Sequence, residues 1–273
     1  MLGTGTPNPD PDRYGTSVAV VVDDASYLVD FGVGVVRRAA AAERSGIKAL
    51  NAVNLTRAFA THLHSDHTLG LADLILTPWI LEREQPLSVY GPRGLRAMVD
   101  HLVAAYAADL SVRTTGGEPR HKHNPRTVDV HEIPAPGVVY RDDQVTVTAF
   151  AVKHGAWPQA FGYRFKTPDR TIVVSGDTGP DSPIEEQCQR CDVLVHEVYS
   201  SAGFAKRPPE WQAYHSRYHT SGRELVAIAA RAKPGLLVLY HQLIWSSTEE
   251  ELLREVREVY DGKVASAHDL DVY

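Results

Sequence analysis

Residues 61–70, THLHSDHTLG, constrain the fold of this chain more than any other segment. They place His62, His64, Asp66 and His67 within six positions. His62 and His64 would point the same way from an extended segment, whereas Asp66 and His67 follow after the chain turns. An exposed polar loop is the alternative, but such a cluster directly before a helix has no obvious packing purpose. The pattern therefore predicts two neighbouring metal subsites; imidazole and carboxylate suit Zn²⁺ and would also suit Mn²⁺ or Fe²⁺.

Four ligands cannot fill two metal sites, so further ligands are expected at the ends of other strands. His154 follows the strand pattern VTAFAVK, Asp177 follows TIVVS, and His241 follows LLVLY. A lone histidine after a strand is more often a surface or hydrogen-bonded residue. Three such residues in a chain that already carries the loop motif favour a shared metal centre.

Hydrophobic periodicity predicts alternating strands and helices. No linker, low-complexity tract or short repeat interrupts them, so one compact domain over residues 1–273 is the simplest organisation. The expected strands or strand pairs are 16–32, 56–61, 87–92, 138–155, 161–177, 191–199, 236–241 and 263–273. The expected helices are 35–46 (closed by Gly46), 69–83 (broken near Pro78), 93–110, 220–232 and 247–262. Residues 111–127 are interpreted as a polar surface excursion, and residues 206–219 as a loop that could cover the metals.

The chain contains only two cysteines, and they lie close together in the sequence. Cys188 and Cys191 form a lone C-x-x-C without the second pair of a four-thiolate zinc site. We interpret them as residues on a helix face; a redox pair or a local disulfide is the alternative.

Gly3, Gly5 and Pro7 have the composition of a loop that should follow a strand. A first strand or a removed targeting segment is therefore expected ahead of Met1.

Charge and hydropathy exclude several classes of protein. A net charge of -6 and a pI near 6.1 argue against a broad cationic face for nucleic acid. The sequence contains no run of 18 or more apolar residues, so no membrane span is expected. Without a signal-peptide pattern the expected location is the cytoplasm, with export as the alternative if a signal was removed.

The metal motifs together carry a family resemblance. H-x-H-x-D-H at 62–67, VKHG, SGDT and LYHQ resemble the metallo-β-lactamase superfamily. LGTGTP, YGPRG, HEVY and HTSGREL narrow the resemblance to the branch of the tRNA 3′-end endonuclease ribonuclease Z and its phosphodiesterase-like relatives. It spans nearly the whole chain. It implies an α/β (α+β) fold, a four-layer αββα sandwich with a dinuclear centre between the sheets, and a homodimer.

The resemblance also assigns roles within the centre. One metal, expected to be Zn²⁺, would be held by His62, His64 and His154, and a second Zn²⁺ by Asp66, His67 and His241. Asp177 would bridge the two metals, which would share a hydroxide as nucleophile. His219 with Glu197 would help the leaving group as a general acid, so Asp66, His219 and Glu197 are the expected catalytic residues.

Several of these assignments have structural alternatives. His219 could instead be a capping or surface histidine, and Glu197 a partner of another buried polar group. His196 is interpreted as a buried histidine, with support of a ligand as the alternative. The motif containing His219 reads HTS where the family has HST.

The expected substrate follows from the absence of the tRNA-binding arm that ribonuclease Z carries. Ribonuclease Z carries a Gly/Pro-rich tRNA-binding arm ahead of SGDT, but residues 155–174 suffice here only for a strand, a turn and a strand. Nucleic acid is therefore not the expected partner; a small molecule is. Aromatic and basic residues near the motifs could line its cleft, or could be core or dimer contacts: Trp157, Trp211, Tyr214, Tyr218, Trp245, Arg207 and Arg217.

The expected reaction is hydrolysis of small phosphodiesters or related phosphate or sulfate esters. Attack at carbonyl carbon, as in lactonases, thioesterases and β-lactamases, is the alternative within the superfamily. A binding module without metals and a di-iron redox protein are alternatives of other classes. All seven ligand positions are filled, which disfavours the binding module, and no flavodoxin-like domain is attached, which disfavours the redox protein.

Overall fold

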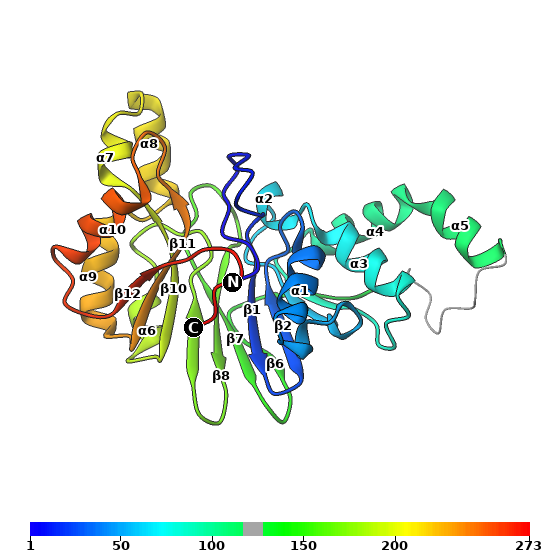
Figure 1. Ribbon diagram of the computed structural model, residues 1–273. Coiled ribbons are helices and arrows are strands. Elements are labelled where there is room, and N and C mark those ends of the chain that lie inside the picture. Colours follow the sequence, from blue (N-terminus) through cyan, green and yellow to red (C-terminus); the bar gives the residue numbers. More distant parts are fainter. Residues whose placement is uncertain (117–127) are drawn as a thin grey trace.

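Two stacked β-sheets with helices on both outer faces form the molecule (Figure 1). The computed structural model describes residues 1–116 and 128–273. The order of layers is helices, sheet, sheet, helices, and it confirms the predicted αββα sandwich. No helix in the described residues is long and apolar enough to cross a bilayer.

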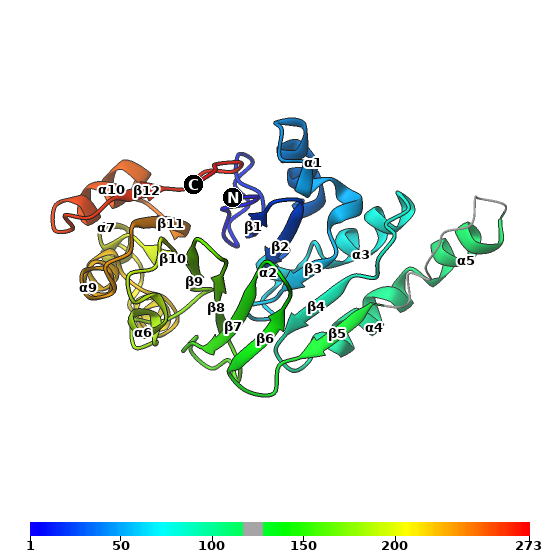
Figure 2. The same cartoon turned by 90° about the horizontal axis from the view of Figure 1, so that it is seen from below.

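The first sheet contains five strands in the order β1-β2-β3-β4-β5, and only β1 is antiparallel to its neighbour. Asp23, with φ of 51°, begins the turn of the β1–β2 hairpin, as predicted. Helices α1, α3 and α4 cover the outer face of this sheet (Figure 2). The elements of this half are β1 Val18–Val22, β2 Ala25–Val29, α1 Val35–Arg44, η1 Lys48–Leu50, η2 Ala52–Asn54, β3 Arg57–Phe59, α2 Ser65–Thr68, α3 Leu71–Ile80, β4 Ser88–Gly91, α4 Leu95–Ala105, α5 Ala107–Thr115 and β5 Asp129–Glu132.

The second sheet contains seven strands in the order β12-β11-β10-β9-β8-β7-β6. Strands β9 to β12 run parallel, whereas β6 to β9 form antiparallel pairs. Helices α6, α9 and α10 pack on its outer face. The elements of this half are β6 Gly137–Arg141, β7 Thr146–Ala151, β8 Phe161–Lys166, β9 Thr171–Val174, α6 Ile184–Cys188, β10 Val193–Tyr199, α7 Ser201–Ala205, α8 Pro209–Tyr218, α9 Gly222–Ala232, β11 Leu236–Leu243, α10 Glu249–Arg257 and β12 Val264–Ser266.

Aromatic side chains fill the space between the sheets. Tyr27 and Phe59 of the first sheet meet Tyr163, Phe165 and Tyr240 of the second, and all five are buried. Burial of one such side chain stabilises the fold by roughly 1.5–3 kcal/mol. The sheets are therefore held face to face below the edge at which the metal motifs lie.

Pro78 does not break its helix, contrary to the prediction. It lies inside α3, which continues to Ile80. Proline has no N–H to offer the carbonyl of Leu74. The buried Arg83 guanidinium donates to that carbonyl at 2.9 Å and to the carbonyl of Ile75 at 3.3 Å, so a side chain replaces the missing backbone donor.

Two predicted loops are also helical. Residues 111–115 belong to α5, and the remainder of the predicted surface excursion lies outside the described residues. Residues 209–218 form α8, where a loop was expected. Helix α8 begins with Pro209 at its first position, which suits the fixed φ of proline. It stands with α7 above the second sheet in Figure 1.

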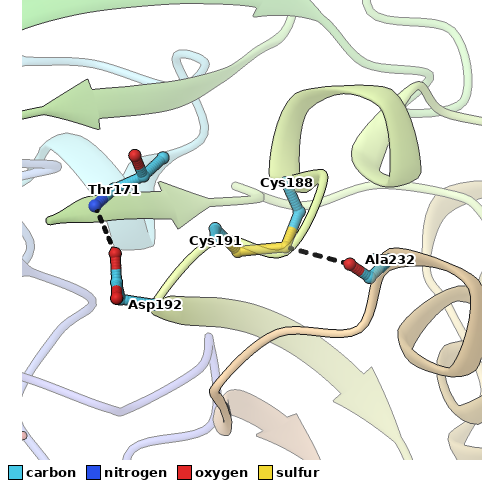
Figure 3. The surroundings of a disulfide bond; sticks show 5 residues. All are labelled: Thr171, Cys188, Cys191, Asp192 and Ala232. Atoms are coloured by element: carbon cyan, nitrogen blue, oxygen red, sulfur yellow. Dashed lines mark hydrogen bonds between the residues drawn. A yellow bond between two sulfur atoms is a disulfide. The ribbon is translucent and has the colours of Figure 1, made fainter.

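Cys188 and Cys191 form a disulfide, so their interpretation as two residues on a helix face was wrong (Figure 3). Cys188 ends α6, and the left-handed backbone of Gln189 and Arg190 turns the chain back, which brings Cys191 beside it. Both residues are buried against α9. Asp192 follows directly, and its carboxylate accepts a hydrogen bond from the Thr171 N–H at 2.7 Å. The bridge thus lies at the start of β10.

Candidate metal centre

The H-x-H-x-D-H segment connects β3 to a single turn of helix, α2. His64 has extended backbone at the start of α2, and its carbonyl accepts a hydrogen bond from the Thr68 hydroxyl at 2.8 Å. Asp66 and His67 lie on the helical turn. The backbone changes from extended at His62 and His64 to helical at Asp66 and His67, as the sequence predicts.

His62, His64, His154 and Asp177 form a first group of converging ligand atoms. His62 Nε2 lies 2.8 Å and His154 Nε2 lies 3.2 Å from His64 Nδ1. His154 follows β7, and its Nδ1 lies 2.8 Å from the Tyr218 carbonyl oxygen, to which it can donate. That hydrogen bond leaves Nε2 as the free lone pair directed toward the other two histidines.

Asp66, His67 and His241 form a second group, adjacent to Asp177. Asp66 Oδ2 lies 3.1 Å from His241 Nε2 and 3.4 Å from His67 Nε2. Asp177 Oδ2 lies 3.5 Å from His67 Nε2, and Asp177 Oδ1 lies 3.4 Å from His241 Nδ1. Asp177 therefore belongs to the first group and also borders His67 and His241 of the second.

A β-bulge directs His241 into the centre. The prediction placed His241 at the end of its strand, but β11 continues to Leu243. Tyr240 pairs with Glu197 and Gln242 with Val198, so His241 is the extra residue of the bulge. Its φ of 44° is left-handed. Bulges commonly re-aim a side chain beside a functional site, and this one does so within the strand.

Unpaired buried atoms provide a test of whether a metal fits here. Among the described residues, His67 Nε2, Asp177 Oδ1 and His241 Nδ1 are buried without a hydrogen-bond partner. Orphaned buried polar atoms are costly unless something completes them. The nitrogen and carboxylate atoms of each group lie within 4.8 Å of one another, and this donor set suits zinc. The residues therefore fit the binding of divalent metal.

Asp30, which the sequence analysis missed, supports the second group from below. Its buried carboxylate accepts from the Thr61 N–H at 2.7 Å, from the Thr61 hydroxyl at 2.9 Å and from His67 Nδ1 at 2.8 Å. A carboxylate behind a ligating histidine fixes the tautomer that presents the other nitrogen. The available signal was an aspartate after the apolar run YLV, but spacing alone does not connect it to a loop 31 residues later.

Burial and charge set the protonation of the ligands. Burial lowers the pKa of His154 to about 4 and that of His62 well below its ordinary value, which keeps their lone pairs free. Burial opposes ionisation of Asp66, but the charges of His67 and His241 outweigh it and lower the pKa of Asp66 to about 2. Burial opposes protonation of His67 and His241, but the charges of Asp177 and Asp66 outweigh it and raise the pKa of both histidines. His62 and His154 are therefore neutral beside charged carboxylates, whereas His67 and His241 would release protons when a cation binds.

His219 lies beside Asp177 and Glu197 in the buried centre. His219 Nδ1 is 3.3 Å from Glu197 Oε2 and 3.9 Å from Asp177 Oδ2. Glu197 Oε1 accepts from the Thr220 N–H at 2.8 Å and from the Thr178 N–H at 3.4 Å. Burial raises the pKa of Glu197 and lowers the pKa of His219 to about 4, so at neutral pH this buried pair does not carry two opposite full charges.

The beta-lactamase superfamily domain model matches residues 26–242, which include every residue of both groups. The chain belongs to the beta-lactamase superfamily. A ribonuclease Z from Mycobacterium bovis (strain BCG / Pasteur 1173P2) is 32% identical over 99% of this chain and 95% of its own length. The chain is thus a ribonuclease Z-like, metal-binding hydrolase of the metallo-β-lactamase fold.

Solved structures share this fold. Human tRNase Z, short form, aligns with a TM-score of 0.72 and 24% identity over 100% of this chain and 96% of its own. The metallo-beta-lactamase fold protein YhfI from Bacillus subtilis aligns with a TM-score of 0.71 and 18% identity over 98% of this chain and 95% of its own.

Of the aromatic residues that the sequence indicated, Trp157 and Tyr218 contact His64 and His154 directly. The Trp157 indole N–H donates to His64 Nε2 at 2.8 Å, and the Tyr218 ring lies 5.1 Å from the His154 ring. A neutral imidazole that accepts at Nε2 carries its proton on Nδ1. For His64 to present Nδ1 to a metal, this hydrogen bond has to open.

The remaining predicted substrate residues lie on α8 or beside it. Trp211 and Trp245 pack on either side of His215, at 5.6 and 4.7 Å between ring centroids. The His215 ring in turn lies 5.7 Å from the His219 ring. Arg217 is exposed and its Nε donates to the Ala213 carbonyl, whereas Arg207 lies over the rings of Trp211 and Trp245. Arg207 therefore borders the two tryptophans, whereas Arg217 faces solvent.

Proposed function

We propose that this hydrolase cleaves phosphodiesters with two zinc ions. The observation that carries the proposal is the convergence of the two ligand groups on Asp177, with the His219–Glu197 pair beside it. When bound, two zinc ions would supply Lewis acidity and lower the pKa of a water molecule that serves as nucleophile.

The protein's own residues would position and transfer protons around this reaction. Asp66 and Asp177 would hold the negative charge that keeps both cations in place. The buried His219–Glu197 pair would share the proton that the leaving oxygen needs, with Glu197 also fixing the orientation of the His219 ring. The backbone N–H groups of Thr178 and Thr220 donate to Glu197 Oε1, which leaves Glu197 Oε2 directed toward His219. A fixed donor of this kind reduces the reorganisation needed in the transition state.

The aromatic residues would contact the part of the substrate that leaves. Tyr214 and Tyr218 stack at 4.2 Å between centroids, and Trp211 is 45% exposed on the same helix. Flat exposed rings favour an aromatic or apolar group. We assign Trp157, Trp211, Tyr218 and Trp245 to this contact, and Arg217 to attraction of an anionic substrate before it binds.

A tRNA precursor is the second candidate substrate. The mycobacterial relative named ribonuclease Z is matched over 95% of its own length, so the absence of a long arm does not separate this chain from proteins of that name. The acidic net charge of -6 still favours a small diester.

The test is a substrate panel on zinc-loaded protein. Bis(p-nitrophenyl) phosphate, p-nitrophenyl sulfate, a lactone, nitrocefin and a 3′-extended tRNA would be compared for the parent, for Asp177→Ala, and for Asp169→Ala as an exposed carboxylate control. The proposal predicts the highest kcat/KM on the phosphodiester, lost in Asp177→Ala and kept in Asp169→Ala. A preference for lactone or nitrocefin would place the attack at carbonyl carbon, and a preference for tRNA would establish the second candidate.

We further propose a homodimer in the cytoplasm. Light scattering during gel filtration would give twice 30.0 kDa for the dimer and 30.0 kDa for a monomer. The Cys188–Cys191 disulfide bears on the location, because disulfides persist mainly in oxidising compartments. A bridge that stays oxidised in cells would argue for export, and free thiols there would support the cytoplasm.

A further inference from the structure

Helix α8 carries two tyrosines, Tyr214 and Tyr218, on one face directly ahead of His219. Because they are spaced by i and i+4, their side chains lie one above the other along the helix. The two rings stack with their centroids 4.2 Å apart and their planes at 20°. The last turn of α8 thus brings a pair of phenol rings to the candidate metal centre.

Tyr218 is fixed against the loop that carries His154. Its ring lies 5.1 Å from the His154 ring, and its hydroxyl accepts a hydrogen bond from the Ala156 N–H at 3.1 Å. Gly155 between them has a left-handed φ of 53°, and a Cβ there would lie 2.0 Å from Cζ of Tyr218. The loop therefore packs tightly on this ring, which makes Tyr218 a rigid support for Tyr214.

Tyr214 is held at its ring but not at its hydroxyl. Besides the stack on Tyr218, Trp211 and His215 meet the half-buried ring edge to face, at 5.8 and 5.1 Å between centroids. Among the residues that the structure describes, none forms a hydrogen bond with the Tyr214 hydroxyl. A partly buried tyrosine usually gives its hydroxyl to a polar partner. This hydroxyl is therefore available to a ligand while its ring stays fixed.

The Tyr214 hydroxyl lies within electrostatic reach of two acids of the centre. Burial raises the pKa of Tyr214, and the charges of Tyr218, Asp177 and Asp66 raise it further. Charge effects fade over roughly 10 Å, so the hydroxyl lies on the side of the centre where Asp66 and Asp177 meet. A phenol whose pKa is raised above its ordinary value keeps its proton at neutral pH, so it can donate a hydrogen bond there.

We propose that the Tyr214 hydroxyl donates a hydrogen bond to a phosphoryl oxygen of the bound diester. This inference rests on the proposed function, because it assigns the donor to the substrate of that reaction. The nonbridging oxygens of a phosphodiester carry its negative charge, which has to be stabilised in the transition state. A neutral donor on a preformed ring stack does so with little reorganisation. Tyr214 would thus contact a different oxygen from the leaving oxygen, which the His219–Glu197 pair serves.

The test compares two replacements of Tyr214 in the full, zinc-loaded chain. Tyr214→Phe removes only the hydroxyl, whereas Tyr214→Leu also removes the ring stack. Tyr106→Phe, at an exposed tyrosine between α4 and α5, is the matched control. Zinc content, kcat/KM for bis(p-nitrophenyl) phosphate and the Kd of orthophosphate by calorimetry would be measured for each protein.

We expect Tyr214→Phe to keep its zinc, to lower kcat/KM roughly 10- to 100-fold and to bind orthophosphate roughly tenfold more weakly. Tyr214→Leu should lose at least as much, and Tyr106→Phe should match the parent. The expected loss is that of one hydrogen bond to a charged oxygen, since phenylalanine preserves the stack on Tyr218.

Three results would overturn the assignment. If Tyr214→Phe equals an active parent and only Tyr214→Leu is impaired, the ring acts by stacking alone, and the proposed reaction stands without this donor. If Tyr214→Phe loses zinc, the hydroxyl supports the metal centre and not the substrate. If the parent neither hydrolyses the diester nor binds orthophosphate, the proposed function itself fails, and the role of Tyr214 fails with it.

Discussion

Replacing Asp30 with asparagine should weaken metal binding without touching a ligand. In the native chain the carboxylate accepts three hydrogen bonds, two from Thr61 and one from His67 Nδ1. An asparagine with its NH₂ group toward His67 requires Nδ1 to accept, which moves the imidazole proton to Nε2. In the opposite orientation its NH₂ group faces the Thr61 N–H, donor against donor. Either arrangement disturbs the tautomer or the loop that presents His67 Nε2.

The size of the effect follows from these contacts. Loss of the partner behind a ligating histidine typically costs 10–100-fold in metal affinity, or about 1.4–2.7 kcal/mol. The metal-free protein should lose roughly 1.5–3 kcal/mol of unfolding free energy for each hydrogen bond to the buried charge that is not replaced.

The assay is zinc competition against a chromophoric chelator, with urea unfolding of the metal-free form measured in parallel. Asp169→Asn, which removes an exposed carboxylate, is the matched control and should change neither quantity. Folded Asp30→Asn that binds zinc within twofold of the parent would refute the argument that Asp30 sets the tautomer of His67.

Three further predictions concern single contacts. Trp157→Phe removes the hydrogen bond to His64 Nε2 that competes with metal binding, so zinc affinity should stay equal or rise up to several-fold; a tenfold loss would contradict this reasoning. Burial lowers the pKa of His196 to about 4, below its unfolded value near 6.5, so the unfolded chain binds the proton first and stability is lost as pH falls from about 6.5 toward 4. His196→Gln should flatten that pH slope in metal-free protein by up to about 1.4 kcal/mol per unit, and an unchanged slope would count against a buried neutral histidine. Replacing both Cys188 and Cys191 by serine opens a four-residue loop and should cost about 2 kcal/mol of stability, with a Tm that no longer responds to reductant; a parent Tm insensitive to reductant would contradict the bridge.

The two groups of converging side chains were predictable because histidines and aspartates follow short apolar runs at strand ends. His62 to His67 lie within one loop, and His154, Asp177 and His241 each follow an apolar run. The strands that precede them were equally clear, since buried β-branched residues dominate them. Their convergence at one edge of the sandwich confirms the αββα fold. The single-domain organisation stays a prediction.

The errors arise where periodicity and composition do not record which side chains and backbone groups meet in the folded chain. Pro78 breaks a helix in isolation, but the guanidinium of the nearby Arg83 donates to the carbonyl of Leu74, for which Pro78 has no N–H. Helix α8 mixes aromatic and polar residues without a clean apolar stripe, and packs through rings such as His215 against Trp245. The disulfide depends on a left-handed turn at Gln189, which the sequence pattern does not indicate. The role of Asp30 depends on the close approach of β2 to the loop that carries His62 and His67.

The central claim is that seven residues of this chain hold two metal ions. It is tested most directly by the metal content of protein purified without added metal and then equilibrated with zinc, measured by elemental analysis beside Asp177→Ala. The account predicts two zinc ions per parent chain and a lower content in the variant, in which both groups lose their shared carboxylate. A parent chain that retains no metal after exposure to zinc, manganese or iron would contradict it.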